Sequence, residues 1–386
     1  MRIVILALLG SLSLFTGPAA QPKTDLVFIG TYTNKDGSKG IYRCEFDPAT
    51  GKLSKPMLAI ESSNPSFLAI HPSGKALYAV NEDGKFEGKP SGAISAFRLD
   101  RETGKLEFVN QTATGGPNPC HVVVHPQGDL VAVANYNGGG GEKGPWTNNF
   151  SYYHIFPGKG GLYFKGEWHF GGSSVDKGRQ QATHPHSVNF TPDGKFLLLA
   201  DLGTDKVTIF PVNFKDVSLS RPKSGELTLK PGAGPRHLDF SAKGDRVYVV
   251  NELNSTVTVF DLAKTKELQT ITTLPKGADT KKNFPAEIRV HRELGYVYAS
   301  NRGHDSIAVF KINKDDGTLT AVGHVQHPAI KNPRGFTLHG NYLIAAGQNT
   351  NKIVVFRIDP AKGNLKAINE EVEVPVPVCV RVLKRT

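Results

Sequence analysis

Short stretches in which apolar and polar residues alternate recur along this chain, and each begins with a proline. The copies start at Pro65, Pro119, Pro185, Pro235, Pro285, Pro333 and Pro377. Alternation with a period of two predicts β-strands. A repeat of roughly fifty residues that is built only from strands is typical of a propeller with four-stranded blades. The chain is therefore predicted to be all-β, a seven-bladed β-propeller.

Each copy is followed by two more stretches of strand character. The second stretch is strongly apolar, and the third alternates again, as in residues 93–99 and 256–262. Turn residues separate the first stretch from the second, for example at 72–75 and 192–195, and favour tight hairpins. The second stretches cover residues 77–82, 131–136, 197–202, 247–252, 297–302 and 343–348.

The two ends of the chain complement each other. Residues 27–33, residues 39–46 and a strand after Leu53 match second, third and fourth strands, whereas residues 377–383 match a first strand with nothing after it. We expect the last blade to be closed by the N- and C-terminal strands, so that no sheet edge stays open. Residues 21–386 are then a single propeller domain. The longest spacing between copies locates an insertion in the second blade, around residues 138–141 and Trp146.

The first twenty residues differ from the rest. Arg2 precedes an apolar run over residues 3–15, and small residues at 17–20 precede Gln21. This pattern predicts a signal peptide over residues 1–20, cleaved after Ala19 or Ala20, and a periplasmic or secreted protein. The alternative is an N-terminal anchor that stays in place, although the run is short for a membrane span. No other stretch is apolar enough to cross a bilayer, so no membrane span is expected after cleavage.

The charge of the chain narrows the choice of partners. The formal net charge is +11, but the basic residues are scattered and form no long run. The scattering of the basic residues excludes a nucleic-acid partner, and the positive net charge favours an anionic small molecule. Cys44, Cys120 and Cys379 each lie in an apolar strand and are expected to be small buried side chains. We predict no metal site and no cofactor, and the oligomeric state stays open.

Polar residues concentrate where first strands begin and second strands end. Antiparallel pairing places these corners together at one mouth of the central channel, where a ring of charged groups indicates a binding site. Arg236 and Glu252 could bind an anion and activate water, or could only brace the fourth blade as an ion pair. His71, His125 and His291 recur in the turn after the first strand and are interpreted as structural. The other candidates at the mouth are His121, His184, His186, His237, Asn251, Glu287, Asn301, Arg302 and Arg334, with Arg289 slightly deeper.

Several motifs carry a family resemblance. They include FIGTYT (28–33), HPHSVNFTPDGKF (184–196), GPRHLDFS (234–241), SNRGHDSIAVF (300–310) and the long segment 332–359. The chain resembles the seven-bladed lactonase family, which includes a bacterial type of 6-phosphogluconolactonase and the fungal carboxymuconate lactonising enzymes. The resemblance implies a metal-independent propeller acting on a lactone. It also implies that His186, Arg236, Glu252 and either Arg302 or Arg289 occupy proposed active-site positions.

These observations lead to a functional hypothesis. The chain is expected to be a lactone hydrolase that opens a sugar-acid lactone with an activated water. Glu252 or His186 is the candidate base, and Arg236 is the oxyanion or carboxylate partner. Arg302 and Arg334 would hold the anionic end of the substrate, and Asn251 and Asn301 its hydroxyls. The alternatives are a non-catalytic extracytoplasmic propeller that binds ligands or proteins, and a muconate-type cycloisomerase. The export signal leaves open whether the lactone is phosphorylated.

Overall fold

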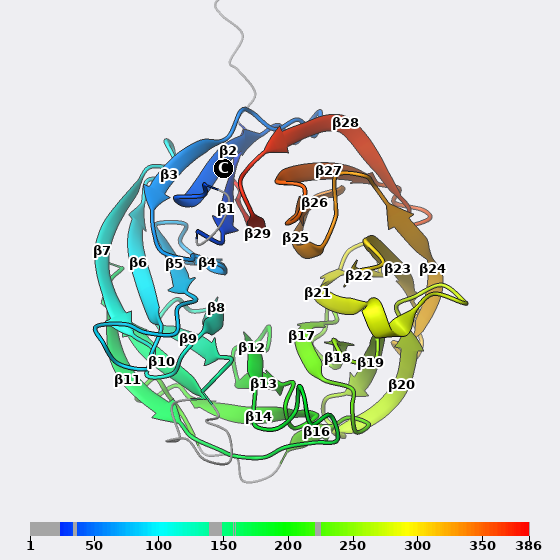
Figure 1. The fold of residues 1–386 in the computed structure, drawn as a ribbon, viewed down its shortest axis with the longest axis horizontal. Coiled ribbons are helices and arrows are strands. Elements are labelled where there is room, and N and C mark those ends of the chain that lie inside the picture. The colour runs from blue at the N-terminus through cyan, green and yellow to red at the C-terminus, as the bar shows by residue number, and fades with distance from the viewer. Residues whose placement is uncertain are drawn as a thin grey trace, which may run out of the picture.

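The protein is a ring of seven antiparallel sheets around a central axis, as Figure 1 shows. The computed structural model describes residues 24–33, 37–138, 149–156, 158, 160–220 and 225–385. The predicted all-β, seven-bladed fold is confirmed, with four strands in each blade except blade 3. We number the blades 1 to 7 from the copy that begins at Pro65.

The first strand of every blade lines the axis, and the second strand follows it outward. The first strands are β4 (Leu68–Ile70), β8 (Pro119–Val124), β12 (Pro185–Phe190), β17 (Pro235–Phe240), β21 (Phe284–His291), β25 (Pro333–His339) and β29 (Pro377–Leu383). The second strands are β5 (Ala76–Asn81), β9 (Leu130–Asn135), β13 (Phe196–Asp201), β18 (Arg246–Asn251), β22 (Tyr296–Arg302), β26 (Tyr342–Gly347) and β1 (Asp25–Thr31).

The third and fourth strands build the outer part of each blade. The third strands are β6 (Ala93–Leu99), β10 (Phe150–Ile155), β14 (Lys206–Asn213), β19 (Thr256–Asp261), β23 (Ser306–Ile312), β27 (Lys352–Ile358) and β2 (Gly40–Phe46). The outer strands are β7 (Leu106–Ala113), β11 (Leu162–Trp168), β20 (Lys266–Thr272), β24 (Leu319–Gln326), β28 (Leu365–Glu373) and β3 (Met57–Glu61). In blade 3 two short strands, β15 (Ser218–Leu219) and β16 (Glu226–Thr228), replace the outer strand. One 3₁₀ turn, η1 (Thr280–Lys282), precedes β21.

Blade 7 is built from both ends of the chain, as the sequence predicts. β29 pairs with β1 in antiparallel register from Leu26 opposite Leu383 to Thr31 opposite Pro377. Figure 1 shows the red β29 beside the blue β1 on the inner side of the ring. The last strand of the chain therefore closes the ring and removes the open edges.

The core lies between adjacent blades. Second strands are buried on both faces, and every residue of β5, β9 and β26 is buried. Large side chains from third strands, such as Phe97, Phe260 and Phe310, fill the space between sheets. Cys44, Cys120 and Cys379 are free thiols inside this packing, which confirms their predicted burial.

Three histidines in the turns after first strands join neighbouring blades. The Nε2 atoms of His71, His125 and His291 lie 2.8, 3.1 and 3.0 Å from the carbonyl oxygens of Gly128, Gly194 and Gly340. Each of these glycines lies in the matching turn of the next blade. The interpretation of these three histidines as structural residues is confirmed.

Two sequence predictions fall outside the described residues. They are the signal peptide over residues 1–20 and most of the insertion around residues 138–141 and Trp146. Within the described ranges, no helix has the length and apolar character needed to cross a membrane.

Candidate active site

A bulge near the start of the first strands aims consecutive side chains at the channel. The strand register shifts just after the opening proline in blades 2, 3, 4 and 6, and over a slightly longer stretch in blade 5. On a regular strand Arg236 and His237 would point to opposite faces, but a bulge re-aims one of them. Their side chains meet in the channel, with Arg236 Nη1 3.3 Å from His237 Nε2. The bulge therefore lets both Arg236 and His237 face the channel.

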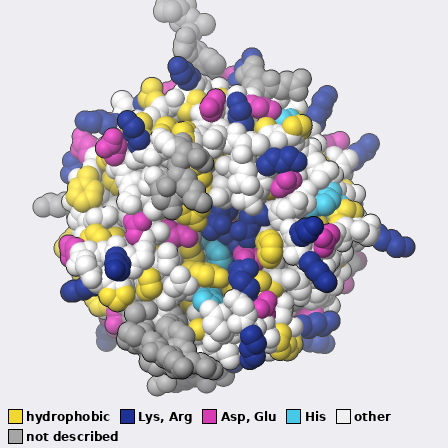
Figure 2. Space-filling view, viewed as in Figure 1, with side chains coloured by type: hydrophobic (Ala, Val, Ile, Leu, Met, Phe, Trp, Pro, Cys, Tyr) yellow, Lys and Arg dark blue, Asp and Glu magenta, His cyan; other side chains and the backbone are white. Residues whose placement is uncertain are grey.

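The carboxylate of Glu252 is the centre of an arginine cluster at the channel mouth. Arg236 Nε and Arg302 Nη2 each lie 2.8 Å from Glu252 Oε2, and Arg179 Nη2 donates to Oε1 at 2.6 Å. Arg236 comes from β17, Glu252 follows β18 and Arg302 ends β22. The ion pair between Arg236 and Glu252 is thus one part of a network that joins blades 4 and 5 to the connection before β12. Figure 2 shows Lys and Arg side chains gathered at the centre of the ring.

The arginines keep Glu252 ionised. Burial opposes the negative charge, but Arg302 and Arg236 outweigh it and hold the pKa of Glu252 well below its usual range. Both carboxylate oxygens already bind guanidinium groups. A carboxylate in this state accepts a proton poorly, which argues against Glu252 as the general base. Its role is to fix the arginines.

His186 is buried in β12 as a neutral imidazole. Burial lowers its pKa well below the ordinary value, and the positive charge of Arg236 lowers it further. Nδ1 of His186 lies 3.7 Å from the sulfur of Cys120, while Nε2 makes no hydrogen bond with any described residue. The imidazole edge packs against the rings of Tyr136 and His237. His186 therefore offers an uncharged nitrogen beside the arginine cluster.

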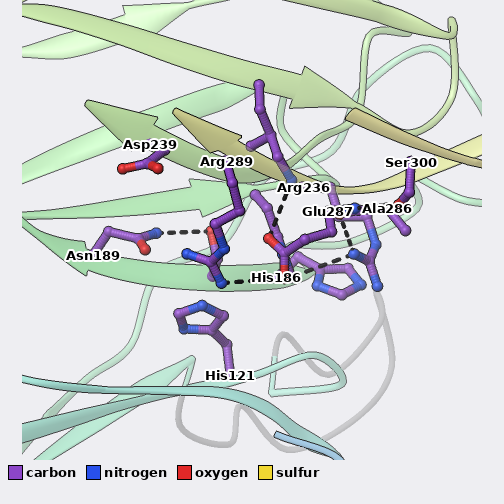
Figure 3. Close-up of polar contacts among 12 residues, drawn as sticks. His121, His186, Asn189, Arg236, Asp239, Ala286, Glu287, Arg289 and Ser300 are labelled. Atoms are coloured by element: carbon purple, nitrogen blue, oxygen red, sulfur yellow. Dashed lines mark hydrogen bonds and ion pairs between the residues drawn. The ribbon is translucent and has the colours of Figure 1, made fainter. Parts of the chain in front are cut away.

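A second polar layer lies deeper in the channel. Glu287 of β21 accepts from His237 Nδ1 at 3.0 Å and from Arg289 Nη2 at 3.2 Å. The ring of His121 lies 5.2 Å from that of His237, and burial lowers the pKa of both imidazoles. Figure 3 shows His121, His186, Arg236, Glu287 and Arg289 around one part of the channel. Arg289 binds Glu287 and Arg302 binds Glu252, so Arg302 is the arginine that joins the mouth cluster.

Arg334 is the second residue of β25 and lies on the blade 6 side of the mouth. Its guanidinium lies over the ring of Tyr32, 5.3 Å from the centroid, and makes no hydrogen bond or ion pair with the residues that the structure describes. The Tyr32 hydroxyl donates to Glu82 at 2.9 Å, and the Ser66 hydroxyl donates to the same oxygen at 2.5 Å. Arg334 is consequently the arginine of the mouth with the most donors left for a ligand.

The predicted roles of Asn251 and Asn301 are wrong. Both side chains are fully buried. Asn251 donates to the hydroxyls of Thr256 and Thr258, and Asn301 donates to the Thr273 carbonyl. These amides tie strands together and do not reach the channel.

His184 is held at the edge of the mouth. Its Nδ1 lies 3.0 Å from the carbonyl of Tyr136, and its ring stacks on the Tyr136 ring at 4.7 Å. The pKa of His184 is lowered by burial. His184 therefore shapes the wall beside His186.

Two arginines of the channel were not predicted. Arg179 lies in the connection between β11 and β12, outside the repeat, and no local pattern marks it. Arg381 lies on β29 two residues after Cys379, the position that Arg289 holds relative to Glu287 on β21. Aligning the seven copies residue by residue would have found Arg381. Its Nε donates to the Leu68 carbonyl at 2.9 Å, and its guanidinium lies over Phe67.

Among the residues described, no group of three or more His, Cys, Asp or Glu side chains is placed to hold a metal ion. The mouth instead combines four guanidinium groups, from Arg179, Arg236, Arg302 and Arg334, with two carboxylates and neutral histidines. This balance favours an anionic ligand.

Known proteins share both the sequence and the ring. The family model described as lactonase, seven-bladed β-propeller, matches residues 26–382. The chain is 34% identical over 366 residues to a 6-phosphogluconolactonase of Bacillus subtilis, covering 92% of this chain and 97% of that protein. It is 33% identical over 357 residues to a 6-phosphogluconolactonase of Formosa agariphila, covering 90% and 96%. The solved periplasmic gluconolactonase of Pseudomonas aeruginosa is similar, with a TM-score of 0.83, 28% identity and coverage of 94% and 99%. The chain belongs to the lactonase family of seven-bladed β-propellers.

Proposed function

We propose that this protein hydrolyses a lactone that carries an anionic group, at the channel mouth formed by blades 3 to 6. One observation carries the proposal: the neutral imidazole of His186 lies beside guanidinium groups that Glu252 fixes in place. The relatives named 6-phosphogluconolactonase support the reaction class.

His186 supplies the proton transfer. Its Nε2 accepts a proton from water as the water oxygen attacks the lactone carbonyl carbon, and the carbonyl oxygen becomes an oxyanion. Collapse of this intermediate breaks the ring C–O bond, and the imidazolium returns the proton to the departing alkoxide. The products are a free hydroxyl group and a carboxylic acid, which releases its proton to water and becomes a carboxylate. The lowered pKa of His186 makes its protonated form a strong acid for that second step.

Arg236 stabilises the oxyanion. Its Nε binds Glu252, and its Nη1 binds the Ala286 carbonyl and His237. Nη2 makes no hydrogen bond with any residue in the described ranges and is therefore available to the developing charge. A donor held in place before the reaction needs little rearrangement in the transition state.

Arg334 and Arg302 hold the anionic end of the substrate. Arg302 uses Nε on the Phe284 carbonyl and Nη2 on Glu252, while the donors of Arg334 remain open. A forked guanidinium binds a carboxylate or phosphate through two hydrogen bonds.

Replacing Arg334 tests the anion site. Arg334→Leu is expected to lower kcat/KM for 6-phosphogluconolactone by about 10- to 100-fold, because a hydrogen bond to a charged group is lost. Hydrolysis of uncharged glucono-δ-lactone should change by less than about threefold. Steady-state assays with both lactones measure the difference.

Arg357→Leu is the matched control for this experiment. Arg357 also lies over a tyrosine ring, that of Tyr342 at 5.1 Å, but on the exposed face of β27. An equal loss on both lactones in Arg334→Leu would contradict the anion site and leave lactone hydrolysis standing. No turnover of either lactone by the unaltered protein would contradict the proposed function and favour a non-catalytic binding propeller.

We also propose export of the protein from the cytoplasm. The apolar run at residues 3–15 and the small residues before Gln21 have the composition of a signal peptide. Mass spectrometry of protein from its own host is expected to find Ala20 or Gln21 at the N-terminus. An intact Met1 in the cytoplasmic fraction would contradict export and would favour a phosphorylated substrate.

A further inference from the structure

A second hollow lies away from the channel mouth, between the outer strands of blades 2 and 3. We call it the blade-3 pocket. Its volume is about 350 Å³, and its walls include Trp168 at the end of β11, Asp201 at the end of β13, and Thr208 and Phe210 of β14. The outer edge of blade 3 is incomplete here, because β16 covers only residues 206–208 of β14.

The junction between blades 2 and 3 lacks a hydrogen bond that three other junctions have. In blades 1, 2 and 5 an asparagine lies at or next to the end of the second strand, and its amide donates to a carbonyl just after the outer strand of the preceding blade. These bonds join Asn81 to Ser63, Asn135 to Thr114 and Asn301 to Thr273, at 2.6, 3.0 and 2.8 Å. Blade 3 has Asp201 at this position. A carboxylate has no N–H group to donate, so this hydrogen bond is absent between blades 2 and 3.

Asp201 is otherwise firmly held. Its Oδ1 accepts hydrogen bonds from the backbone N–H groups of His184 at 2.7 Å and Gly203 at 2.9 Å. Thr204 lies beside the carboxyl group, but no well-aligned hydrogen bond from a described residue reaches Oδ2, which is buried. Burial raises the pKa of Asp201 to about 6. Oδ1 of Asp201 is thus hydrogen-bonded, whereas Oδ2 has no hydrogen-bond partner among the described residues.

Trp168 contributes the complementary open group. Its indole Nε1 is also buried without a hydrogen-bond partner among the described residues. An unpaired buried donor or acceptor is unfavourable, so such groups usually have a partner. Here an unpaired donor and an unpaired acceptor belong to walls of one pocket, which is much larger than a single water needs.

The residues that line the pocket indicate what kind of ligand it could bind. Trp168, Phe170 and Phe210 provide flat apolar surface, and the rings of Trp168 and Phe210 lie 5.6 Å apart. Lys206 is already paired with Glu226 at 2.7 Å. The carboxylate of Asp201 therefore makes the pocket unfavourable for an anion, in contrast to the channel mouth.

We propose that the blade-3 pocket binds a neutral sugar or similar polyol as a second ligand site. A sugar hydroxyl both donates and accepts, so hydroxyls on one ring can donate to Asp201 Oδ2 and accept from Trp168 Nε1. The apolar face of the ring lies on the aromatic walls, and the volume matches that of small-ligand pockets. This site does not depend on lactone hydrolysis at the mouth.

Nuclear magnetic resonance of the indole N–H groups tests the proposal directly. The chain has two tryptophans, and Trp168→Phe assigns the Trp168 signal by its loss. Titration with methyl glucoside, galactoside and mannoside is expected to shift the Trp168 signal saturably for at least one sugar. The expected dissociation constant is on the order of 1 mM for a ligand of this size. The Trp146 signal is the internal control.

Asp201→Asn is the matched variant. It keeps the shape and the acceptor for His184 and Gly203, and it supplies the amide donor that Asn81, Asn135 and Asn301 use at three other junctions. We expect at least a tenfold weaker sugar affinity with no loss of melting temperature. Trp168→Phe should hydrolyse lactones at the rate of the unaltered protein.

Three results would overturn the proposal. One is the absence of a Trp168 shift with all three sugars at fifty times the expected dissociation constant. Another is an equal shift with inorganic phosphate, which would assign the pocket to anions. The third is unchanged sugar affinity in Asp201→Asn.

Discussion

Deleting residues 377–386 is expected to abolish stable folding of the monomer. β29 pairs with β1 from Leu26 to Thr31, and Val378, Cys379, Val380 and Leu383 are buried. Each large apolar side chain that loses its burial costs about 1.5–3 kcal/mol, so the total is roughly 5–10 kcal/mol. Domains of this kind are stable by about 5–15 kcal/mol, so little stability would remain. The measurements are the soluble yield and thermal unfolding followed by circular dichroism.

A shorter deletion provides the control. Removing residues 384–386 keeps β29 and loses mainly the hydrogen bond from Arg385 N–H to Asp25 at 2.7 Å and the ion pair with Glu45. A small fall in melting temperature is expected. A synthetic peptide of residues 375–386 should partly restore folding of the long deletion, because its binding edge on β1 is open. An unchanged melting curve for the long deletion would show that β29 does not close the ring.

The blade pattern could be predicted because the same strands are buried in the same way in every blade. Every second strand is buried on both faces, and every first strand follows a proline, so the repeat appears in the hydrophobic pattern itself. Closure of the ring by the termini could be predicted because the N-terminal stretches match a second, a third and a fourth strand and the C-terminal stretch matches a first strand. The outer edge of blade 3 departs from the pattern because β15 and β16 are short, and a short strand leaves little periodic signal.

The candidate site could be predicted in part. Antiparallel pairing brings first-strand starts and second-strand ends together, which correctly placed Arg236, Glu252 and Arg302 in one cluster. Strand alternation alone could not reveal the bulge that aims Arg236 and His237 the same way. Arg179 reaches Glu252 from an irregular connection, where position depends on tertiary packing. Asn251 and Asn301 have the composition of a ligand site but serve blade structure, a distinction that depends on hydrogen-bond partners.

Loss of His186 is expected to have the largest effect on activity. His186→Ala should lower kcat for lactone hydrolysis by about 10²- to 10⁴-fold, the usual contribution of general acid–base catalysis. Arg236→Ala should cost about 10²- to 10³-fold through the lost oxyanion donor. Arg236→Lys should recover little, because lysine offers a single point charge. Melting temperatures of the variants establish that they are folded, and His184→Ala, which alters only the neighbouring wall, is expected to lose less than about tenfold.

The pH profile separates the roles of His186 and Glu252. The base must be unprotonated, and the pKa of His186 is lowered by burial and by Arg236, so kcat/KM should stay level as pH falls to about 6.5 and decline only below it. The negative charge of Glu252 raises the pKa of His186, which partly offsets that lowering. Glu252→Gln should therefore move the acid limb further toward low pH while reducing kcat/KM through displaced arginines. A Glu252→Gln protein that loses all turnover, beside a His186→Ala protein that keeps it, would make Glu252 the base and contradict this mechanism.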